Sequence, residues 1–148
     1  EDHQMLADKI DACLQDDLKP IFCCGEPLSI REAQTQNRFV EAQLKDSLFH
    51  LSAEELTDFV IAYEPVWAIG TGKTATSQQA QEMHAYIRSV IAEKYGADIA
   101  ESISILYGGS VKASNAKEIF SEKDVDGGLV GGASLIAEEF SAIIKALK

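Results

Sequence analysis

Four short apolar runs, each followed by a helical pattern, limit the folds open to this chain more than any other feature. The runs lie at 21–26, 59–63, 102–107 and 126–130. The second run, Phe-Val-Ile-Ala-Tyr, is too short and too apolar for an exposed helix, which predicts a strand covered on both faces. Strands of this kind separated by helices are typical of parallel βα units with right-handed crossovers. The sequence therefore predicts an α/β fold built on a parallel sheet.

Periodic apolar positions and capping patterns predict the helices between these strands. The clearest helix starts at Thr76, which can form a capping box with Gln79, and ends at Gly96. Ser29 and Glu32 form a similar pattern, which predicts one helix that runs to about residue 45. Further helices are expected over about 5–14, 52–55, 116–120 and 136–147. Because no linker or low-complexity segment interrupts the pattern, residues 1–148 are predicted to form a single domain of four βα units preceded by a helix.

Charge and composition argue against several classes of protein. The chain has 13 Lys and Arg against 24 Asp and Glu, a net charge of −11, which argues against a surface that tracks the phosphates of a nucleic acid. Its longest apolar runs fall short of the roughly 20 residues that cross a membrane. The first residues lack the basic flank and apolar stretch of a secretory signal, so a cytoplasmic protein with no membrane partner is expected.

Cysteine and histidine usage predicts no metal site. Cys13, Cys23 and Cys24 are odd in number and two are adjacent, which favours reduced, buried thiols over disulfides. No Cys-x-x-Cys pair is present, and the three histidines show no metal-ligand spacing. His84 falls in a helical pattern and is expected to serve the structure rather than a site.

Chemistry-bearing residues follow three of the predicted strands, at Glu64, at 108–110 and at 131–132. Loops at the carboxyl ends of parallel strands face the same side of the sheet, so these residues are expected to gather there. Glu64 precedes Pro65 and Trp67, and partial desolvation in such surroundings favours a carboxylate that acts as a general base. A strand-terminal glutamate that caps a helix or pairs with a lysine is the alternative, and both interpretations stay open on these residues alone.

The glycine-containing segment 65–75 matches two nucleotide-binding patterns in part. Residues 72–74 match the end of a Walker A motif, but the glycine needed five positions before the second one is replaced by Trp67. Residues 70–75 fit a degenerate dinucleotide pattern, but its acidic partner would be Glu93, which lies inside a helical stripe. We therefore expect a lid that shuts water out of a site beside the preceding glutamate.

Paired glycines end the third and fourth predicted strands. Gly108 and Gly109 precede Ser110, and Gly131 and Gly132 form the second pair. Such pairs let backbone N–H groups converge on an anion, and two of them on consecutive strands favour a phosphate site. Tight βα turns would also explain either pair taken singly.

Two further charged residues lie near this predicted site. Glu26, which ends the first strand, could be a second acid, but a role in supporting the lid through Trp67 or Tyr63 is preferred. Lys73 is expected to be a solvated lid residue rather than a catalytic group.

Residues 62–72, Ala-Tyr-Glu-Pro-Val-Trp-Ala-Ile-Gly-Thr-Gly, closely resemble the signature of the triose-phosphate isomerase family. The resemblance extends over essentially the whole chain, including Cys-Cys-Gly-Glu at 23–26, Leu-Tyr-Gly-Gly-Ser-Val at 106–111 and Val-Gly-Gly-Ala-Ser-Leu at 130–135. It implies the second half of a TIM (βα)8 barrel. It also implies an enzyme of glycolysis and gluconeogenesis that interconverts D-glyceraldehyde 3-phosphate and dihydroxyacetone phosphate through an enediol or enediolate.

The resemblance implies roles for individual residues. In the family, the glutamate that matches Glu64 moves the proton between two substrate carbons, and the segment that matches 65–75 closes over the substrate. The phosphate is held by groups that match Gly70, Ser110, Gly131 and Gly132. Residues that match Tyr107 and Ser110 latch the closed lid.

The resemblance also implies a support for the lid and an oligomeric state. Glu26 matches a residue that supports the lid tryptophan, which is Trp67 here. No cofactor or metal is implied. The partners are a triose phosphate and further copies of the chain, since the family forms dimers.

The chain departs from the family in length. A whole barrel needs about 250 residues, whereas 148 are present and resemble the end of the fourth helix through the eighth βα unit. The family's Asn and Lys after the first strand and His after the fourth, which polarise the substrate carbonyl, have no counterpart here. Two functions therefore stay open: an isomerase with Glu64 as base, or a half-barrel that keeps the phosphate site with little or no turnover. The first and last strands are expected to expose apolar edges, which predicts self-association.

Overall fold

Four parallel strands form one sheet whose order follows the chain. In the computed structural model, which describes residues 1–147, the strands are β1 (Ile21–Cys24), β2 (Val60–Tyr63), β3 (Ser104–Tyr107) and β4 (Gly127–Gly128). Cys24, Tyr63 and Tyr107 pair side by side at the carboxyl end of the sheet, and Gly128 lies next to Tyr107. The predicted α/β fold with a parallel sheet is confirmed.

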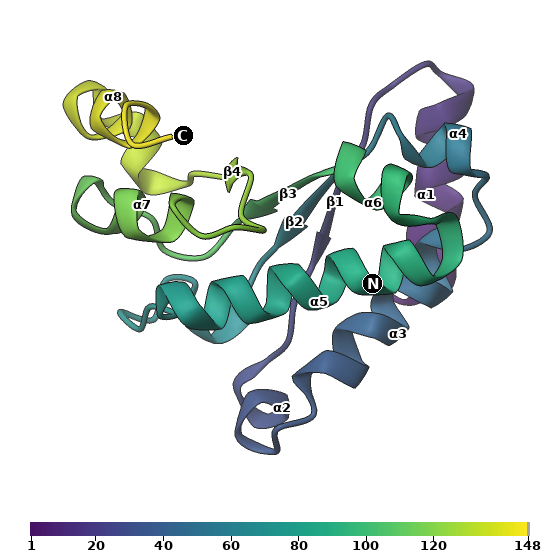
Figure 1. The fold of residues 1–148 in the computed structure, drawn as a ribbon, viewed down its shortest axis with the longest axis horizontal. Coiled ribbons are helices and arrows are strands. Elements are labelled where there is room, and N and C mark those ends of the chain that lie inside the picture. The colour runs from purple at the N-terminus through teal and green to yellow at the C-terminus, as the bar shows by residue number, and fades with distance from the viewer. Residues whose placement is uncertain (148) are drawn as a thin grey trace.

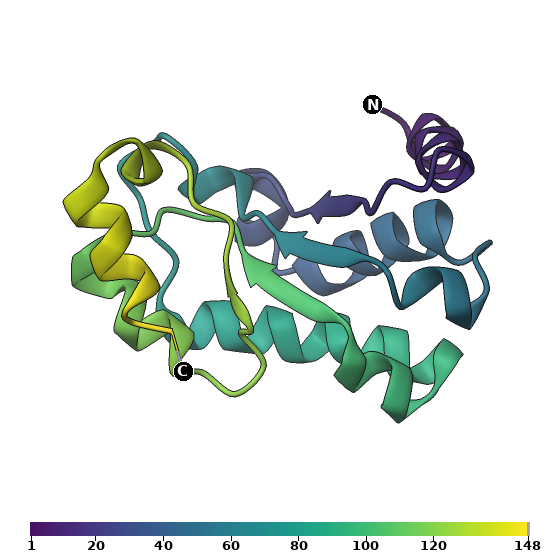
Figure 2. The same cartoon turned by 90° about the horizontal axis from the view of Figure 1, so that it is seen from above.

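Helices connect the strands and lie mainly on one side of the sheet. They are α1 (His3–Gln15), α2 (Leu28–Glu32), α3 (Gln36–Leu48), α4 (Ala53–Leu56), α5 (Ser77–Tyr95), α6 (Ala97–Ser102), α7 (Ala113–Phe120) and α8 (Ala137–Ile144), with short 3-10 turns η1 (Val66–Ala68) and η2 (Gly132–Leu135). Figure 1 labels the elements, and Figure 2 shows α3 and α5 on one side of the strands. None of the helices within residues 1–147 has the length and apolar character needed to cross a lipid bilayer.

The covered face of the sheet forms the core. Phe22, Ile61 and Ile105 pair side by side on the first three strands and are buried in one hydrophobic cluster with the helices. On the opposite face Ile21 is 50% exposed and Cys23 is exposed. Successive strand residues point to opposite faces, so this alternation means that one face has a helical layer and the other has none.

The expectation of strands covered on both faces is therefore only partly correct. It holds for the inner strand β2, where Ala62 is buried, and it is wrong for the edge strand β1. The expectation of buried thiols is wrong for the same reason, because Cys24 is buried but its neighbour Cys23 points to the open face. The apolar composition of a strand indicates that it is buried, but it does not show whether helices cover one face of the sheet or both.

Two local predictions about helices are wrong. Ser29 and Glu32 form no capping box, because α2 begins after Pro27 without a side-chain cap, and Gln34 adopts a left-handed φ of 55° that separates α2 from α3. The third strand begins later than predicted, because Ser102, expected to start it, instead ends α6 (Ala97–Ser102), and β3 starts at Ser104. The capping box that opens α5 is confirmed, and α4 opens in the same way, with Ser52 and Glu55.

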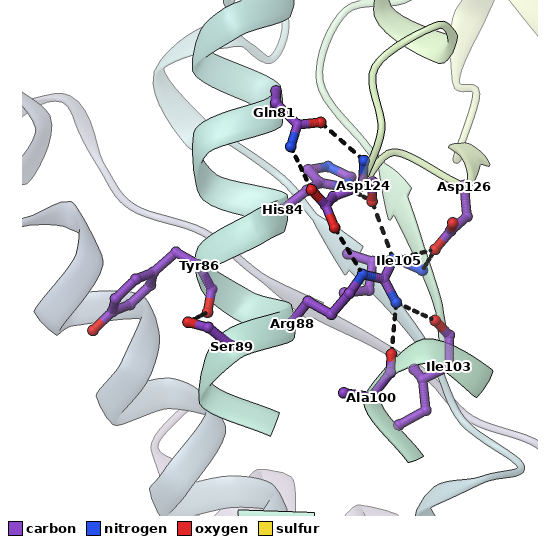
Figure 3. A network of polar contacts seen from close by, with 10 residues as sticks. All are labelled: Gln81, His84, Tyr86, Arg88, Ser89, Ala100, Ile103, Ile105, Asp124 and Asp126. Carbon is purple, nitrogen blue, oxygen red and sulfur yellow. Dashed lines mark hydrogen bonds and ion pairs between the residues drawn. The ribbon is translucent and has the colours of Figure 1, made fainter. Parts of the chain in front are cut away.

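Arg88 of α5 ties the sheet to the segment that precedes β4 (Figure 3). Its Nη1 donates to the carbonyl oxygens of Ala100 at 2.6 Å and Ile103 at 3.2 Å. Its Nη2 donates to the backbone oxygen of Asp124 at 3.2 Å and to Oδ2 of Asp126 at 2.7 Å, and Nε donates to Oδ1 of Asp124 at 3.2 Å. These five contacts match the five N–H donors of a guanidinium group.

The acceptors of Arg88 are themselves anchored. Asp126 Oδ2 also accepts the backbone N–H of Ile105 at 2.7 Å, and the side chain of Gln81 bonds to both the side chain and the backbone of Asp124. The network thereby fixes the entry into β4. The loop after β4 carries Gly131 and Gly132, so the same network sets where these glycines lie.

Candidate functional site

Glu64 lies directly after β2 at the carboxyl end of the sheet. Its backbone N–H donates to the Cys24 carbonyl at 2.7 Å, and Gly108 donates likewise to Tyr63 at 2.8 Å, so the strand pairing extends to the start of both loops. A Cβ atom added at Gly108 would lie 2.6 Å from Cγ of Glu64 and 3.2 Å from its Oε1. The absence of a side chain at Gly108 thus provides the space in which the half-buried Glu64 side chain lies.

Gly25 has a similar relation to the backbone of Glu64. A Cβ atom at Gly25 would lie 1.8 Å from the Glu64 carbonyl oxygen, which is far inside any allowed contact. Gly25 therefore allows the end of β1 to approach the end of β2 closely.

Cys23 is a neighbour of Glu64 that sequence reasoning missed. Although Cys23 faces the open side of the sheet, partial desolvation of its thiol raises its pKa, and the charge of the neighbouring Glu64 carboxylate raises it further. Cys23 pairs with Ala62, two residues before Glu64, on the neighbouring strand. The shared position at the carboxyl ends of adjacent parallel strands was the signal that could have found this contact.

A pocket of about 310 Å³ opens at the same edge of the sheet. It is lined by Ile69, Gly70, Gly108, Gly109, Ser110, Val111, Lys112, Gly131, Gly132 and Ala133. The four residues expected to hold a phosphate, from three separate loops, therefore lie around one cavity. Gly108 belongs both to this lining and to the surface against which Glu64 packs, so the carboxylate and the pocket are adjacent.

Several residues that line the pocket have backbone N–H groups without an acceptor in the described part of the chain. Within residues 1–147, the backbone N–H groups of Gly70, Ser110, Gly131 and Gly132 donate to no other residue. The Ser110 carbonyl accepts from Asn115 at 3.1 Å, and the Gly131 carbonyl accepts from Ser134 through both its N–H and its hydroxyl. Backbone N–H groups without an acceptor, next to two carbonyls that are already engaged, suit an anion.

Glu26 contacts the segment 65–75 through Trp67 and is completely buried. Its Oε1 accepts the indole N–H of Trp67 at 2.8 Å, and both of its carboxylate oxygens lie 3.1 Å from the Tyr63 hydroxyl. Arg31, which sequence reasoning also missed, lies 3.6 Å from the same carboxylate with its guanidinium over the indole ring. The buried carboxylate thus has two donors and a cation as partners, as a buried charge requires.

The outer part of this segment is exposed and shaped by glycines. Gly70 and Gly72 have φ angles of 67° and 79°, values that favour glycine. The Thr71 hydroxyl donates to the Trp67 carbonyl at 2.7 Å and accepts the N–H of Lys73 at 3.2 Å. Lys73 is exposed and does not line the pocket.

Tyr107 lies beneath the exposed segment and is completely buried. Burial raises the pKa of the Tyr107 hydroxyl. The nearby backbone of Ala75 lowers the same pKa by a smaller amount. A Cβ atom at Gly109 would lie 2.2 Å from the Tyr107 hydroxyl oxygen, so Gly109 gives this hydroxyl its space. Among the described residues the hydroxyl has no hydrogen-bond partner.

His84 packs between the two tyrosines rather than in the pocket. Its ring lies 5.8 Å from that of Tyr63 and 6.3 Å from that of Tyr107, and its Nδ1 lies 3.3 Å from the Asp124 carbonyl. Burial lowers its pKa to about 4, which keeps the imidazole neutral at pH 7. His84 is thus part of the packing around the site.

Comparison with known proteins decides the family. The family model described as triosephosphate isomerase matches residues 1–147. The chain belongs to the triosephosphate isomerase family. The resemblance seen at residues 62–72 is therefore confirmed, and the four parallel strands with their helices correspond to half of the triosephosphate isomerase barrel.

Curated triosephosphate isomerases support the same conclusion. One from Phocaeicola vulgatus is 59% identical over 145 residues, which cover 98% of this chain and 57% of that protein. One from Cytophaga hutchinsonii is 59% identical over 98% of this chain and 58% of that protein, and one from Flavobacterium johnsoniae is 54% identical over 99% and 59%. The chain thus spans a little under three fifths of the triosephosphate isomerases to which it is similar.

Proposed function

We propose that this chain carries the base, the lid and the phosphate site of a triosephosphate isomerase. In the proposed reaction, the Glu64 carboxylate takes a proton from the carbon next to the carbonyl of D-glyceraldehyde 3-phosphate. An enediolate results, the hydroxyl proton on the second carbon passes to the oxygen of the former aldehyde, and return of the carbon-bound proton to the first carbon gives dihydroxyacetone phosphate. The proton is conserved, so the reaction needs no redox cofactor.

One observation carries this proposal: Glu64 and the donor-lined pocket share Gly108. A three-carbon phosphate is short, so an enzyme that anchors the phosphate must keep its base next to the anchor. Glu64 Cγ lies 2.6 Å from the position that a Cβ atom of Gly108 would take, so the Glu64 side chain packs against the backbone of a residue that lines the pocket. This adjacency supports proton transfer at a carbon close to a bound phosphate.

The segment 65–75 fits the role of a lid in this proposal. Gly70 belongs to the pocket lining, and Trp67 is held at the root of the segment by Glu26. Movement of the exposed part would bring the Gly70 amide over a bound phosphate and exclude water from the enediolate. The three free cysteines also suit a reducing compartment such as the cytoplasm.

The second candidate is a half-barrel that binds phosphate with little or no turnover. The observation that favours it is the chemistry of the pocket, whose unpaired backbone N–H groups and lysine suit an anion, while Cys23 and Gly108, two described neighbours of Glu64, are not groups that polarise a carbonyl. A base without an electrophile raises the barrier to proton abstraction from carbon.

The test measures conversion of D-glyceraldehyde 3-phosphate by the chain itself, followed by proton NMR, in parallel with binding of inorganic phosphate. The variants are Glu64→Gln, which removes the base while keeping the shape, and Glu101→Gln on α6 as a matched control of equal charge change. We expect any turnover to fall by at least about a hundredfold in Glu64→Gln and to stay unchanged in Glu101→Gln.

The outcomes separate the two candidates. Turnover that Glu64→Gln abolishes supports the isomerase, and turnover that survives this change contradicts it. Phosphate binding without turnover supports the second candidate for the chain on its own. Absence of both would overturn both candidates.

A further inference from the structure

Within residues 1–147, Lys112 is the only charged residue that lines the pocket. We propose that its ammonium group supplies the positive charge that draws a phosphate into this pocket and holds it there, with Asn115 fixing the loop that carries it. This inference rests on the proposed phosphate site and adds a binding residue to it. Sequence reasoning did not single out Lys112.

The ammonium group of Lys112 is available for a ligand. The residue is exposed, and within residues 1–147 its side chain forms no ion pair, whereas Lys9, Lys19 and Lys45 each pair with a carboxylate. A lysine that is already paired would have to give up its partner before it could bind phosphate. Lys112 has no such competing contact.

Asn115 holds the Lys112 loop in place from the first turn of α7. Its Oδ1 accepts the backbone N–H of Lys112 at 2.8 Å, and its Nδ2 donates to the Ser110 carbonyl at 3.1 Å. The two bonds fix both ends of the segment 110–112 at once. They also occupy the Ser110 carbonyl, so an acceptor that would repel phosphate is engaged elsewhere.

The surroundings of the pocket make a local cation important. The chain has a net charge of −11, so its overall field repels anions. Glu139 of α8 adds a nearby negative charge, because its Oε2 accepts the N–H of Ala113 at 3.1 Å at the start of α7. Backbone N–H groups carry only partial charges. Lys112 therefore supplies the full positive charge that offsets Glu139 and the negative net charge of the chain at the pocket.

The test titrates inorganic phosphate into the chain by calorimetry at one pH and low ionic strength. Lys112→Gln removes the charge, Lys112→Arg keeps it, and Lys117→Gln removes an equal charge from α7 outside the pocket. We expect Lys112→Gln to weaken binding by about three- to tenfold, while Lys112→Arg and Lys117→Gln bind like the unchanged chain. Added NaCl should reduce the difference between Lys112→Gln and the unchanged chain.

Each outcome bears on one claim. If the unchanged chain binds no phosphate, the proposed phosphate site itself is wrong. If it binds and Lys112→Gln binds equally well, the site stands and the inference about Lys112 is overturned. Equal weakening in Lys112→Gln and Lys117→Gln would also overturn it, since the effect would then come from net charge alone.

Discussion

The contact between Glu64 and Cys23 can be tested without any catalysis. Burial and the Glu64 carboxylate both raise the pKa of the Cys23 thiol. Removing that charge in Glu64→Gln should lower the thiol pKa and raise the fraction of reactive thiolate. We expect alkylation of Cys23 by iodoacetamide at pH 8 to accelerate by about threefold, measured by mass spectrometry of the modified peptide.

Cys13 provides the internal control for this experiment. It lies on α1, which precedes β1, rather than at the carboxyl end of the sheet, and its alkylation rate should not change. An unchanged ratio of the two rates would show that Glu64 does not act on Cys23, and would place the carboxylate elsewhere in solution.

His84 makes stability depend on pH in a definite direction. Burial lowers its pKa to about 4, against an ordinary value of 6.5. Between these pH values the unfolded chain binds a proton at His84 that the folded chain does not. The free energy of unfolding should therefore fall as the pH drops from 6.5 towards 4, by up to about 1.4 kcal/mol per pH unit from this residue.

The measurement is urea unfolding of the unchanged chain and of His84→Gln between pH 7 and pH 4.5. His84→Gln has no imidazole to protonate, so its free energy of unfolding should fall less steeply with decreasing pH. The difference in free energy of unfolding between the two proteins should therefore narrow at low pH. Asp124, Asp126 and Arg88 also act on the His84 pKa and are the same in both proteins. Parallel curves would contradict the buried, neutral state of His84.

At the scale of elements, Arg88 is the strongest link between α5 and the two carboxyl-terminal strands. Lysine at this position keeps the charge but cannot make five directed contacts. Arg88→Lys should lower the free energy of unfolding by about 3 kcal/mol, measured by urea denaturation. Arg38→Lys, exposed on α3, is the control, and a loss in Arg88→Lys no larger than in that control would refute the importance of the network.

The order and direction of the elements could be predicted from the sequence, and many of their contacts could not. Apolar runs and capping boxes are local signals, so the strands and the start of α5 follow from residues close in the chain. The break at Gln34 has no such signal, because glutamine adopts a left-handed φ only where the tertiary structure imposes it. The network of Arg88 joins residues up to 38 positions apart, which no periodicity reveals.

In the candidate site, too, some residues could be predicted from the sequence and others could not. Glu64 and the paired glycines could be found because strand ends carry their chemistry in consecutive residues. Cys23 and Lys112 could not, because their relevance comes from strand register and from the shape of the pocket. Three-dimensional proximity, rather than residue type, makes these two residues part of the site.

At the scale of the whole molecule, both edges of the sheet are open and apolar. Leu18 and Ile21 are exposed beside β1, and Leu135, Ile136 and Ile144 are exposed after β4. Unpaired strand edges with apolar surroundings favour association with another chain. We expect the chain on its own to self-associate, with two copies closing an eight-stranded ring or with larger aggregates.

Sedimentation equilibrium over a range of concentrations measures this association. The double variant Ile21→Lys and Leu135→Lys places a charge at each edge and should shift the distribution towards monomer. Both residues are at least half exposed, so neither change removes buried packing. A chain that sediments as a monomer at all concentrations would contradict the prediction.

The hydrogen bond between Trp67 and Glu26 has an optical consequence. Trp67 is the only tryptophan of the chain, so the intrinsic fluorescence excited at the red edge of the spectrum comes from this one indole. That indole lies at the root of the segment 65–75 and donates to a buried carboxylate at 2.8 Å, with a guanidinium over its ring. Any displacement of the segment alters both contacts. The emission spectrum of the unlabelled chain therefore reports on the surroundings of this one indole, free of signal from other tryptophans.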